Sequence, residues 1–127
     1  MKKINILVTT VGGVTSPDIL KAYRNTPGYE IKIVGTDAFE FAVGKMFVDH
    51  FEILPISKGN EKLFIKEIKR LVKKYSIDLI IPCGNDDNLV ISRYKDLIPC
   101  KIMTGNYKDL LIAYDKGKVY EELEFNI

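Results

Sequence analysis

The sequence has few of the residues and segments that mark secreted, membrane-bound or metal-dependent proteins. Its only two cysteines, Cys83 and Cys100, are too few for the disulfide framework of a small secreted protein and lack the spacing of a metal or redox motif. The apolar stretch at residues 4–8 is too short for the core of a signal peptide, and no apolar run approaches membrane-spanning length. We therefore expect a cytoplasmic protein with reduced thiols and no membrane partner.

The sequence also has no large excess of positive or negative charge. The sequence has 19 Lys and Arg against 17 Asp and Glu, and a formal net charge of +2 gives no reason to expect a nucleic-acid partner. The single histidine, His50, has no catalytic partner close to it in the sequence, which favours a packing or surface role. Repeats and low-complexity tracts are absent, and 127 residues are enough for one domain with its own core.

Short apolar runs alternate with helical patterns along the chain. Strands are expected at residues 4–10, 30–35, 51–54, 79–81 and 101–103. Helices are expected at residues 16–25, 39–46, 60–75 and from Asp86 or Asp87 to 97, with Ser16 as an N-cap. Such alternation requires right-handed βαβ crossovers. The sequence thus predicts an α/β fold, a Rossmann-like three-layer sandwich with a mostly parallel five-stranded sheet.

Ligands of such sheets bind beyond the carboxyl ends of the strands, so the first strand-end loop is a candidate site. Gly12 and Gly13 let backbone amides approach a phosphate or carboxylate at the start of a helix. The same two glycines could equally serve only a tight turn.

A carboxylate follows the second strand. Asp37 stands where an acid holds the ribose hydroxyls in dinucleotide-binding folds, which makes an NAD(P)-binding oxidoreductase domain an alternative. The glycine pair does not complete the G-x-G-x-x-G fingerprint, however, and Asp37 could instead cap the following segment.

Two further acids follow the fourth strand. Asp86 and Asp87 could orient an ammonium group, position a metal or cap a helix. No combination of nucleophile, base and orienting group can be assembled from the sequence, and no catalytic or metal-binding residue is assigned.

Several segments together resemble the N-terminal (pre-ATP-grasp) domain of ATP-grasp ligases, most closely those of the carbamoyl-phosphate synthase large-subunit type, including carboxylate-amine ligases. The segments are the first strand with its Gly-Gly loop, residues 35–37, residues 78–82 and residues 113–123. The resemblance covers nearly the whole chain. Its most characteristic part is the Asp115-Lys116 pair, which opens a helix with an aromatic residue four positions further on.

The resemblance implies residue roles. Gly12, Gly13, Asp86 and Asp87 are expected to bind substrate, and Lys116, with Asp37, to contact the nucleotide. The segment 83–85 departs from the commoner Thr-containing pattern of the family, which leaves the substrate open.

The resemblance also implies a division of labour between domains. Residues 1–114 would form the front domain and residues 115–127 the start of a helix leading into an ATP-grasp domain, supplied in cis or by a separate chain. The complete enzyme would use ATP and Mg²⁺ to join a small-molecule carboxylate to an amine. The front domain alone is expected to be inactive and to bind no cofactor tightly. A homodimer is also possible from the sequence, and a stand-alone α/β binding module is a further alternative.

Overall fold

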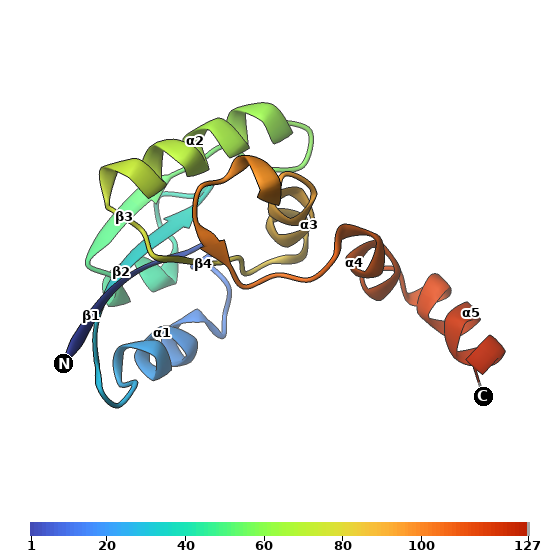
Figure 1. Ribbon diagram of the computed structural model, residues 1–127, viewed down its shortest axis with the longest axis horizontal. Helices are drawn as coiled ribbons and strands as arrows, with labels where there is room; N and C mark the ends of the chain where they lie inside the picture. Colours follow the sequence, from blue (N-terminus) through green and yellow to red (C-terminus); the bar gives the residue numbers. More distant parts are fainter. Residues whose placement is uncertain (127) are drawn as a thin grey trace.

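A parallel five-stranded sheet forms the centre of the protein (Figure 1), in a computed structural model that describes residues 1–126. The strands are β1 (Lys2–Val8), β2 (Tyr29–Asp37), β3 (His50–Ile53), β4 (Leu79–Ile81) and β5 (Lys101–Ile102). They run in the order β3-β2-β1-β4-β5, and every neighbouring pair is parallel. The expected fold class is confirmed.

Helices cover both faces of the sheet. One face carries α1 (Ser16–Arg24) and the 3₁₀ helix η1 (Val43–Phe47). The other carries α2 (Glu61–Lys74) and α3 (Asn85–Arg93), which continues into the short 3₁₀ helix η2 (Lys95–Leu97). Within residues 1–126, no helix is both long and apolar enough to cross a membrane.

Two apolar cores lie on the two faces because successive strand side chains point to opposite sides. Leu7, Val34 and Ile80 are fully buried beneath α2 and α3. Ile6, Ile33 and their neighbours pack under α1 and η1. Burying each such aliphatic side chain contributes about 1.5–3 kcal/mol. Because both faces of the central strands are covered by helices, these strands need continuous apolar runs, as the sequence has.

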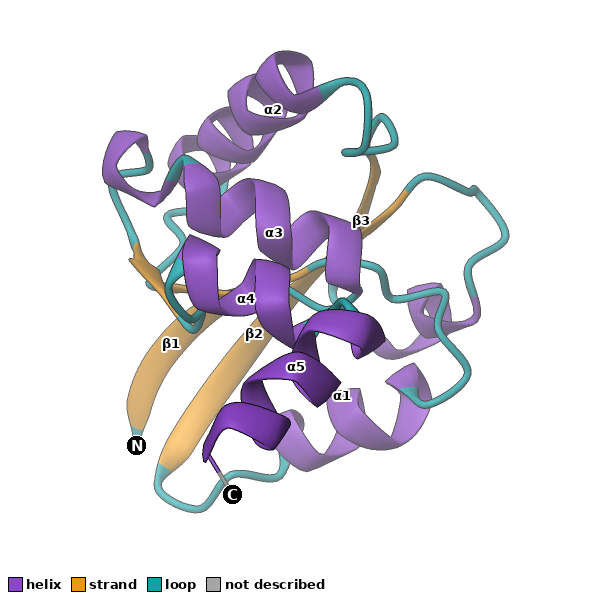
Figure 2. Ribbon diagram, turned by 90° about the vertical axis from the view of Figure 1, so that its right-hand side faces the viewer, coloured by secondary structure: helices purple, strands orange, loops and turns teal. Residues whose placement is uncertain are grey.

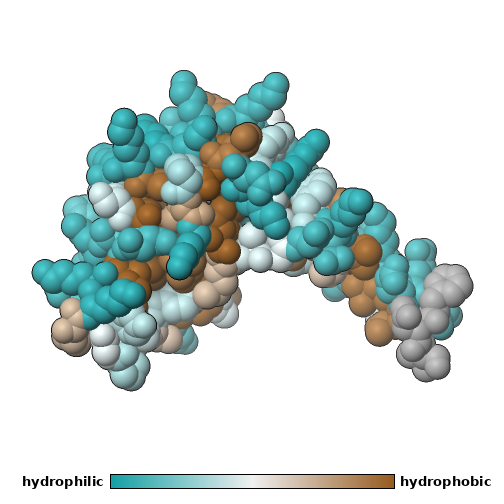
Figure 3. Space-filling view, viewed as in Figure 1, coloured by the Kyte–Doolittle hydropathy of each residue, from teal (hydrophilic) through white to brown (hydrophobic). Residues whose placement is uncertain are grey.

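The chain ends in a helical arm that extends away from the sheet (Figures 1 and 2). The arm consists of α4 (Tyr107–Ala113) and α5 (Lys116–Asn126). Between α4 and α5, the Tyr114 hydroxyl accepts a hydrogen bond from Asn88 Nδ2 on α3 at 2.6 Å. Hydrophobic residues show on the surface of the arm in Figure 3. Tyr120 of α5 is 72% exposed.

Some expected boundaries were wrong. The first strand ends at Val8, not at residue 10, because Thr10 has a left-handed backbone with φ 53° that ends extended structure. Ser16 does not cap the following helix: it lies inside α1, and its hydroxyl donates to the Thr10 carbonyl at 3.5 Å. The helix expected at residues 39–46 is reduced to the short 3₁₀ helix η1.

Two helices near the C-terminus also differ from expectation. α3 begins at Asn85, directly after Gly84, whose φ of +83° turns the chain into the helix, and α3 ends at Arg93. The helix α4 was not expected; Asn106 caps it by accepting a hydrogen bond from the Lys108 N–H at 2.9 Å.

A polar cluster ties α2 to the edge strand β3. Glu52 on β3 accepts hydrogen bonds from Tyr75 Oη at 2.6 Å, Lys74 Nζ at 2.8 Å and Arg70 Nη2 at 3.3 Å. The hydrogen bond from Lys74, followed by that from Tyr75, holds the pKa of the Glu52 carboxyl at about 2, below its ordinary value of 4.5. The charged form of Glu52 therefore stabilises the contact between helix and sheet.

We expect this contact to weaken in acid. Since the pKa of Glu52 is lower in the folded state, its stabilisation is present above about pH 4.5 and is lost as the pH falls toward about 2. Glu52→Gln should lower the free energy of unfolding at pH 7 by about 1–2 kcal/mol and flatten the acid limb of its pH profile. Urea denaturation from pH 7 to pH 2 measures both.

Glu30→Gln is the matched control because Glu30 meets Lys3 only at 4.0 Å between exposed side chains. Its effect should stay within about 0.5 kcal/mol. Equal effects of the two variants would contradict the role assigned to Glu52.

Candidate functional site

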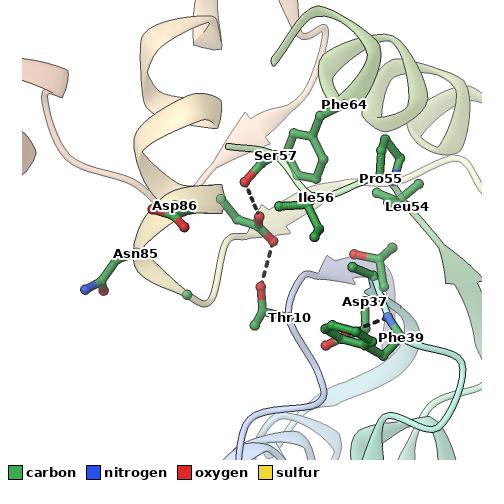
Figure 4. A pocket seen from close by; sticks show the side chains of 14 residues that line it. Thr10, Asp37, Phe39, Leu54, Pro55, Ile56, Ser57, Phe64, Asn85 and Asp86 are labelled. Carbon is green, nitrogen blue, oxygen red and sulfur yellow. Dashed lines mark hydrogen bonds between the residues drawn. The ribbon is translucent and has the colours of Figure 1, made fainter. Parts of the chain in front are cut away.

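The loops at the carboxyl edge of the sheet enclose a cavity of about 300 Å³ (Figure 4). The loops after β1, β2 and β3 and the start of α3 all contribute to its wall. The lining residues are Thr10, Thr36, Asp37, Ala38, Phe39, Leu54, Pro55, Ile56, Ser57, Phe64, Gly84, Asn85, Asp86 and Asp87. The cavity thus lies at the edge where parallel α/β sheets bind their ligands.

Asp87 connects three of these loops. Its Oδ2 accepts a hydrogen bond from Thr10 Oγ1 after β1, and its Oδ1 accepts one from Ser57 Oγ after β3, each at 2.6 Å. Dashed lines in Figure 4 mark both bonds. Because Ser57 is buried, its hydroxyl cannot replace the hydrogen bond to Asp87 with one to bulk water unless the loop after β3 opens. Asp87 therefore fixes the relative positions of the β1, β3 and β4 loops.

Thr10 holds a strained backbone at the centre of this arrangement. Its φ of 53° is unusual for a β-branched residue, and such strain persists only where neighbouring contacts enforce it. Gly84 packs directly against it: a Cβ at Gly84 would lie 2.8 Å from Thr10 Oγ1. The close approach of Thr10 and Gly84 brings the first loop to the start of α3.

Asp37 binds backbone amides of two loops. Its Oδ2 accepts a hydrogen bond from the Gly12 N–H at 2.8 Å, and its Oδ1 accepts one from the Phe39 N–H at 3.0 Å. A Cβ at Gly12 would lie 2.7 Å from Asp37 Oδ2, so this close approach requires glycine. In the structure the carboxylate of Asp37 occupies the position at Gly12 that an anionic ligand was expected to take.

The glycine loop itself lies beside the cavity. Gly12 and Gly13 line a wider hollow of about 860 Å³, which shares Thr10, Asp37 and Phe39 with the cavity. The Gly13 N–H donates to the Thr10 carbonyl at 3.3 Å. Both glycine amides therefore have partners within the protein.

The remaining candidate residues differ in their placement. Asp86 is exposed in the first turn of α3, lines the cavity and has no side-chain partner within the described residues. Lys116 is exposed in the first turn of α5, on the arm, and lines neither the cavity nor the hollow. The structure thus brings Asp37, Asp86 and Asp87 together and leaves Lys116 apart from them.

Nucleophilic and metal chemistry find little support in the described residues. Burial, with the nearby Asp87 carboxylate, raises the pKa of the Cys83 thiol and so disfavours the thiolate. His50 is exposed, with its ring centroid 5.0 Å from that of Tyr75, as a surface role requires. Among residues 1–126, no three His, Cys, Asp or Glu side chains gather to form a metal site. The arrangement can bind and orient a small molecule.

Sequence reasoning missed the partners of Asp87. Thr10 and Ser57 were recognised only as parts of strand-end loops. They lie 77 and 30 positions before Asp87 in the sequence, and no local pattern links residues so far apart. The available signal was their position after parallel strands, since strand ends of one sheet meet at one edge.

Comparisons with known proteins identify the fold. No protein-family model and no curated protein matches the sequence. N5-carboxyaminoimidazole synthetase from Staphylococcus aureus, complexed with ADP, matches 98% of this chain with a TM-score of 0.67 and 16% identity. N5-carboxyaminoimidazole ribonucleotide synthetase from Thermotoga maritima matches 99% with a TM-score of 0.59 and 18% identity. Both are ATP-grasp ligases.

A nicotinamide-dependent fold is also similar. The dTDP-glucose 4,6-dehydratase from Bacillus anthracis str. Ames, in complex with NAD, matches 78% of this chain with a TM-score of 0.51 and 18% identity. This chain covers 30% and 31% of the two synthetases and 36% of the dehydratase. At such identities the likeness is one of fold.

The adjacent acids Asp86 and Asp87 should respond differently to the same change. Asp87→Asn leaves only one oxygen to accept from two hydroxyls, so we expect a loss of about 1–3 kcal/mol in the free energy of unfolding. Asp86→Asn should cost less than about 0.5 kcal/mol, because its side chain is exposed and unpaired. Urea denaturation at pH 7 measures both; a result in which the two variants are equally stable would refute the bridging role of Asp87.

Proposed function

We propose that this chain is the front, substrate-side domain of an ATP-grasp ligase of the carbamoyl-phosphate synthase large-subunit type. In this proposal the cavity at the carboxyl edge of the sheet is part of the active-site wall. ATP and Mg²⁺ are held mainly by further domains, in the same polypeptide or in a partner chain.

The extent of the fold similarity carries the proposal. The matches to the two synthetases cover 98% and 99% of the chain, so they include the α4–α5 arm as well as the sheet. The arm has no role in completing the sheet, and it exposes apolar residues such as Tyr120 and Leu123. An arm of this kind is suited to join a front domain to a neighbouring domain.

The chemistry proposed for the complete enzyme assigns a limited task to this chain. MgATP would activate a carboxylate as an acyl phosphate for attack by an amine, a step that requires cations around the transferred phosphoryl group. The cavity walls contain acids, hydroxyls and apolar groups and no Lys, Arg or His among the described residues. The domain would accordingly bind and orient a substrate while other domains hold the nucleotide.

A nicotinamide-binding oxidoreductase domain is the alternative, favoured by the fold similarity to the NAD complex of the dehydratase. Two features oppose it. The loop with Gly12 and Gly13 lacks the fingerprint glycines, and both carboxylate oxygens of Asp37 already accept hydrogen bonds from backbone amides. A ribose would have to share this carboxylate with those two amides.

We therefore expect NAD and NADP to bind this chain no more tightly than a dissociation constant of about 1 mM, that is, about −4 kcal/mol. Isothermal titration calorimetry measures the constant. A micromolar constant that is lost in Asp37→Ala would replace the ligase proposal with the oxidoreductase.

The ligase proposal is tested by ADP release. The 127-residue chain alone should release no ADP from ATP, whereas the complete enzyme should release ADP only when both a carboxylate and an amine are present. If the complete protein releases no ADP, or releases it equally well without the two substrates, a stand-alone binding module becomes the better description.

Lys116 provides a residue-level test of the same proposal. Lys116→Ala should leave the free energy of unfolding of this chain within about 0.5 kcal/mol, because the side chain is exposed. In the complete enzyme the same change should weaken ATP binding or slow ligation at least about tenfold, or about 1.4 kcal/mol. Lys118→Ala, an exposed lysine on the same helix, is the control. Unchanged ATP constants in Lys116→Ala would refute the nucleotide contact.

A further inference from the structure

The cavity at the carboxyl edge has one apolar side. The β2 and β3 loops contribute Phe39, Leu54, Pro55 and Ile56, and Phe64 of α2 closes the wall behind them (Figure 4). Phe39 is 69% exposed and Ile56 is 55% exposed, so both present apolar surface that a ligand would cover. A volume of about 300 Å³ is at the small end of the range for ligand sites, which is about 300–1,000 Å³. The cavity suits a compact aromatic or aliphatic group.

Acidic and polar side chains also line the cavity. Asp37 lies beside Phe39, whereas Asp86 and Asn85 lie across from them at the start of α3, where Asp87 also belongs (Figure 4). Asp37 is hydrogen-bonded only by backbone amides and Asp87 only by hydroxyls, so neutral donors satisfy both without cancelling their charge. No Lys, Arg or His lines the cavity within the described part of the chain. An anionic ligand would be repelled, and a cationic one attracted.

We propose that this cavity binds a compact, largely apolar ligand that carries a protonated amine, and that Asp86 is the main partner of the amine. Asp86 is the one acid of the three whose carboxylate is free of hydrogen bonds among the described residues. A bare divalent cation fits less well, because the acids of the cavity do not gather into a metal site within residues 1–126. The apolar wall would have no function for a metal ion.

A phosphate group fits less well for the opposite reason. Phosphate is normally bound by Arg, Lys or free backbone amides. The cavity has no such cation, and the amides of Gly12 and Gly13 next to it already have acceptors. α3 also begins at this cavity, but its first turn carries Asp86 and Asp87, whose charges oppose an anion there. We therefore expect the phosphate of a phosphorylated substrate to lie outside this cavity.

This inference deepens the proposed function by naming a class of substrate. It rests on the proposed function only where it takes the bound amine to be the group that attacks in the ligation. The lining residues described above belong to this chain, so binding can be tested on the chain by itself. Three probes of one size separate the effects of charge: benzylamine as the cation, benzyl alcohol as the neutral compound and benzoate as the anion. Amide chemical-shift titration of the ¹⁵N-labelled chain at pH 7 gives both the location and the constant of each probe.

We expect benzylamine to bind at least about tenfold more tightly than benzoate, with benzyl alcohol between them, and to shift the amides of Phe39, Ile56 and Asn85. Asp86→Asn should reduce the preference for benzylamine over benzyl alcohol at least about threefold. Asp96→Asn removes the same charge from an exposed acid of η2 outside the cavity and should leave the preference unchanged.

Three results would overturn the inference: benzoate binding as tightly as benzylamine, shifts mapping outside the cavity, or equal effects of Asp86→Asn and Asp96→Asn. Since Asp86 is exposed, its substitution should not unfold the chain, and the dispersion of the amide spectrum verifies this. Failure of the ligase proposal would appear separately, as absent ADP release in the complete enzyme, and would leave a cation-selective cavity in place.

Discussion

The candidate site depends on the hydrogen bonds that Asp87 accepts from Thr10 and Ser57. These bonds join loops that follow three different strands, and they hold Thr10 in a left-handed conformation that a threonine would not adopt alone. Charge-assisted hydrogen bonds to a carboxylate are among the stronger ones available to a protein. One side chain at the start of α3 thus converts separate strand ends into a single cavity wall.

The strand order explains why this edge is available. The chain moves outward from β1 through β2 to β3, returns across the sheet and continues outward on the other side through β4 and β5. The loops after β1 and β4 therefore depart toward opposite faces and leave a crevice between them. Thr10 and Gly84, which come from those two loops, meet at that crevice.

The fold was more predictable than the site because the two depend on different kinds of interaction. Strand β4 and helix α2 follow from local patterns of apolar residues, and their observed bounds differ little from those expected. The partnership of Asp87 with Thr10 and Ser57 depends on how loops meet in space, which no local pattern encodes. Asp37 illustrates the same limit: the sequence allowed a ligand or a structural role, and only the positions of the Gly12 and Phe39 amides reveal its bonds within the protein.

Two of the three carboxylates that line the cavity, Asp37 and Asp87, are hydrogen-bonded within the described part of the protein, and the third, Asp86, is not. Asp37 and Asp87 use their oxygens to hold the loops, so their substitution would change the shape of the cavity along with its charge. Asp86 makes no such hydrogen bonds within the described residues, yet it lines the same cavity and adds to the same negative potential. A carboxylate without a hydrogen bond to the protein is free to pair with a cationic ligand. The division between two acids that hold the loops and a third acid that lines the cavity without a hydrogen bond from residues 1–126 is the physical basis of the proposed cationic ligand.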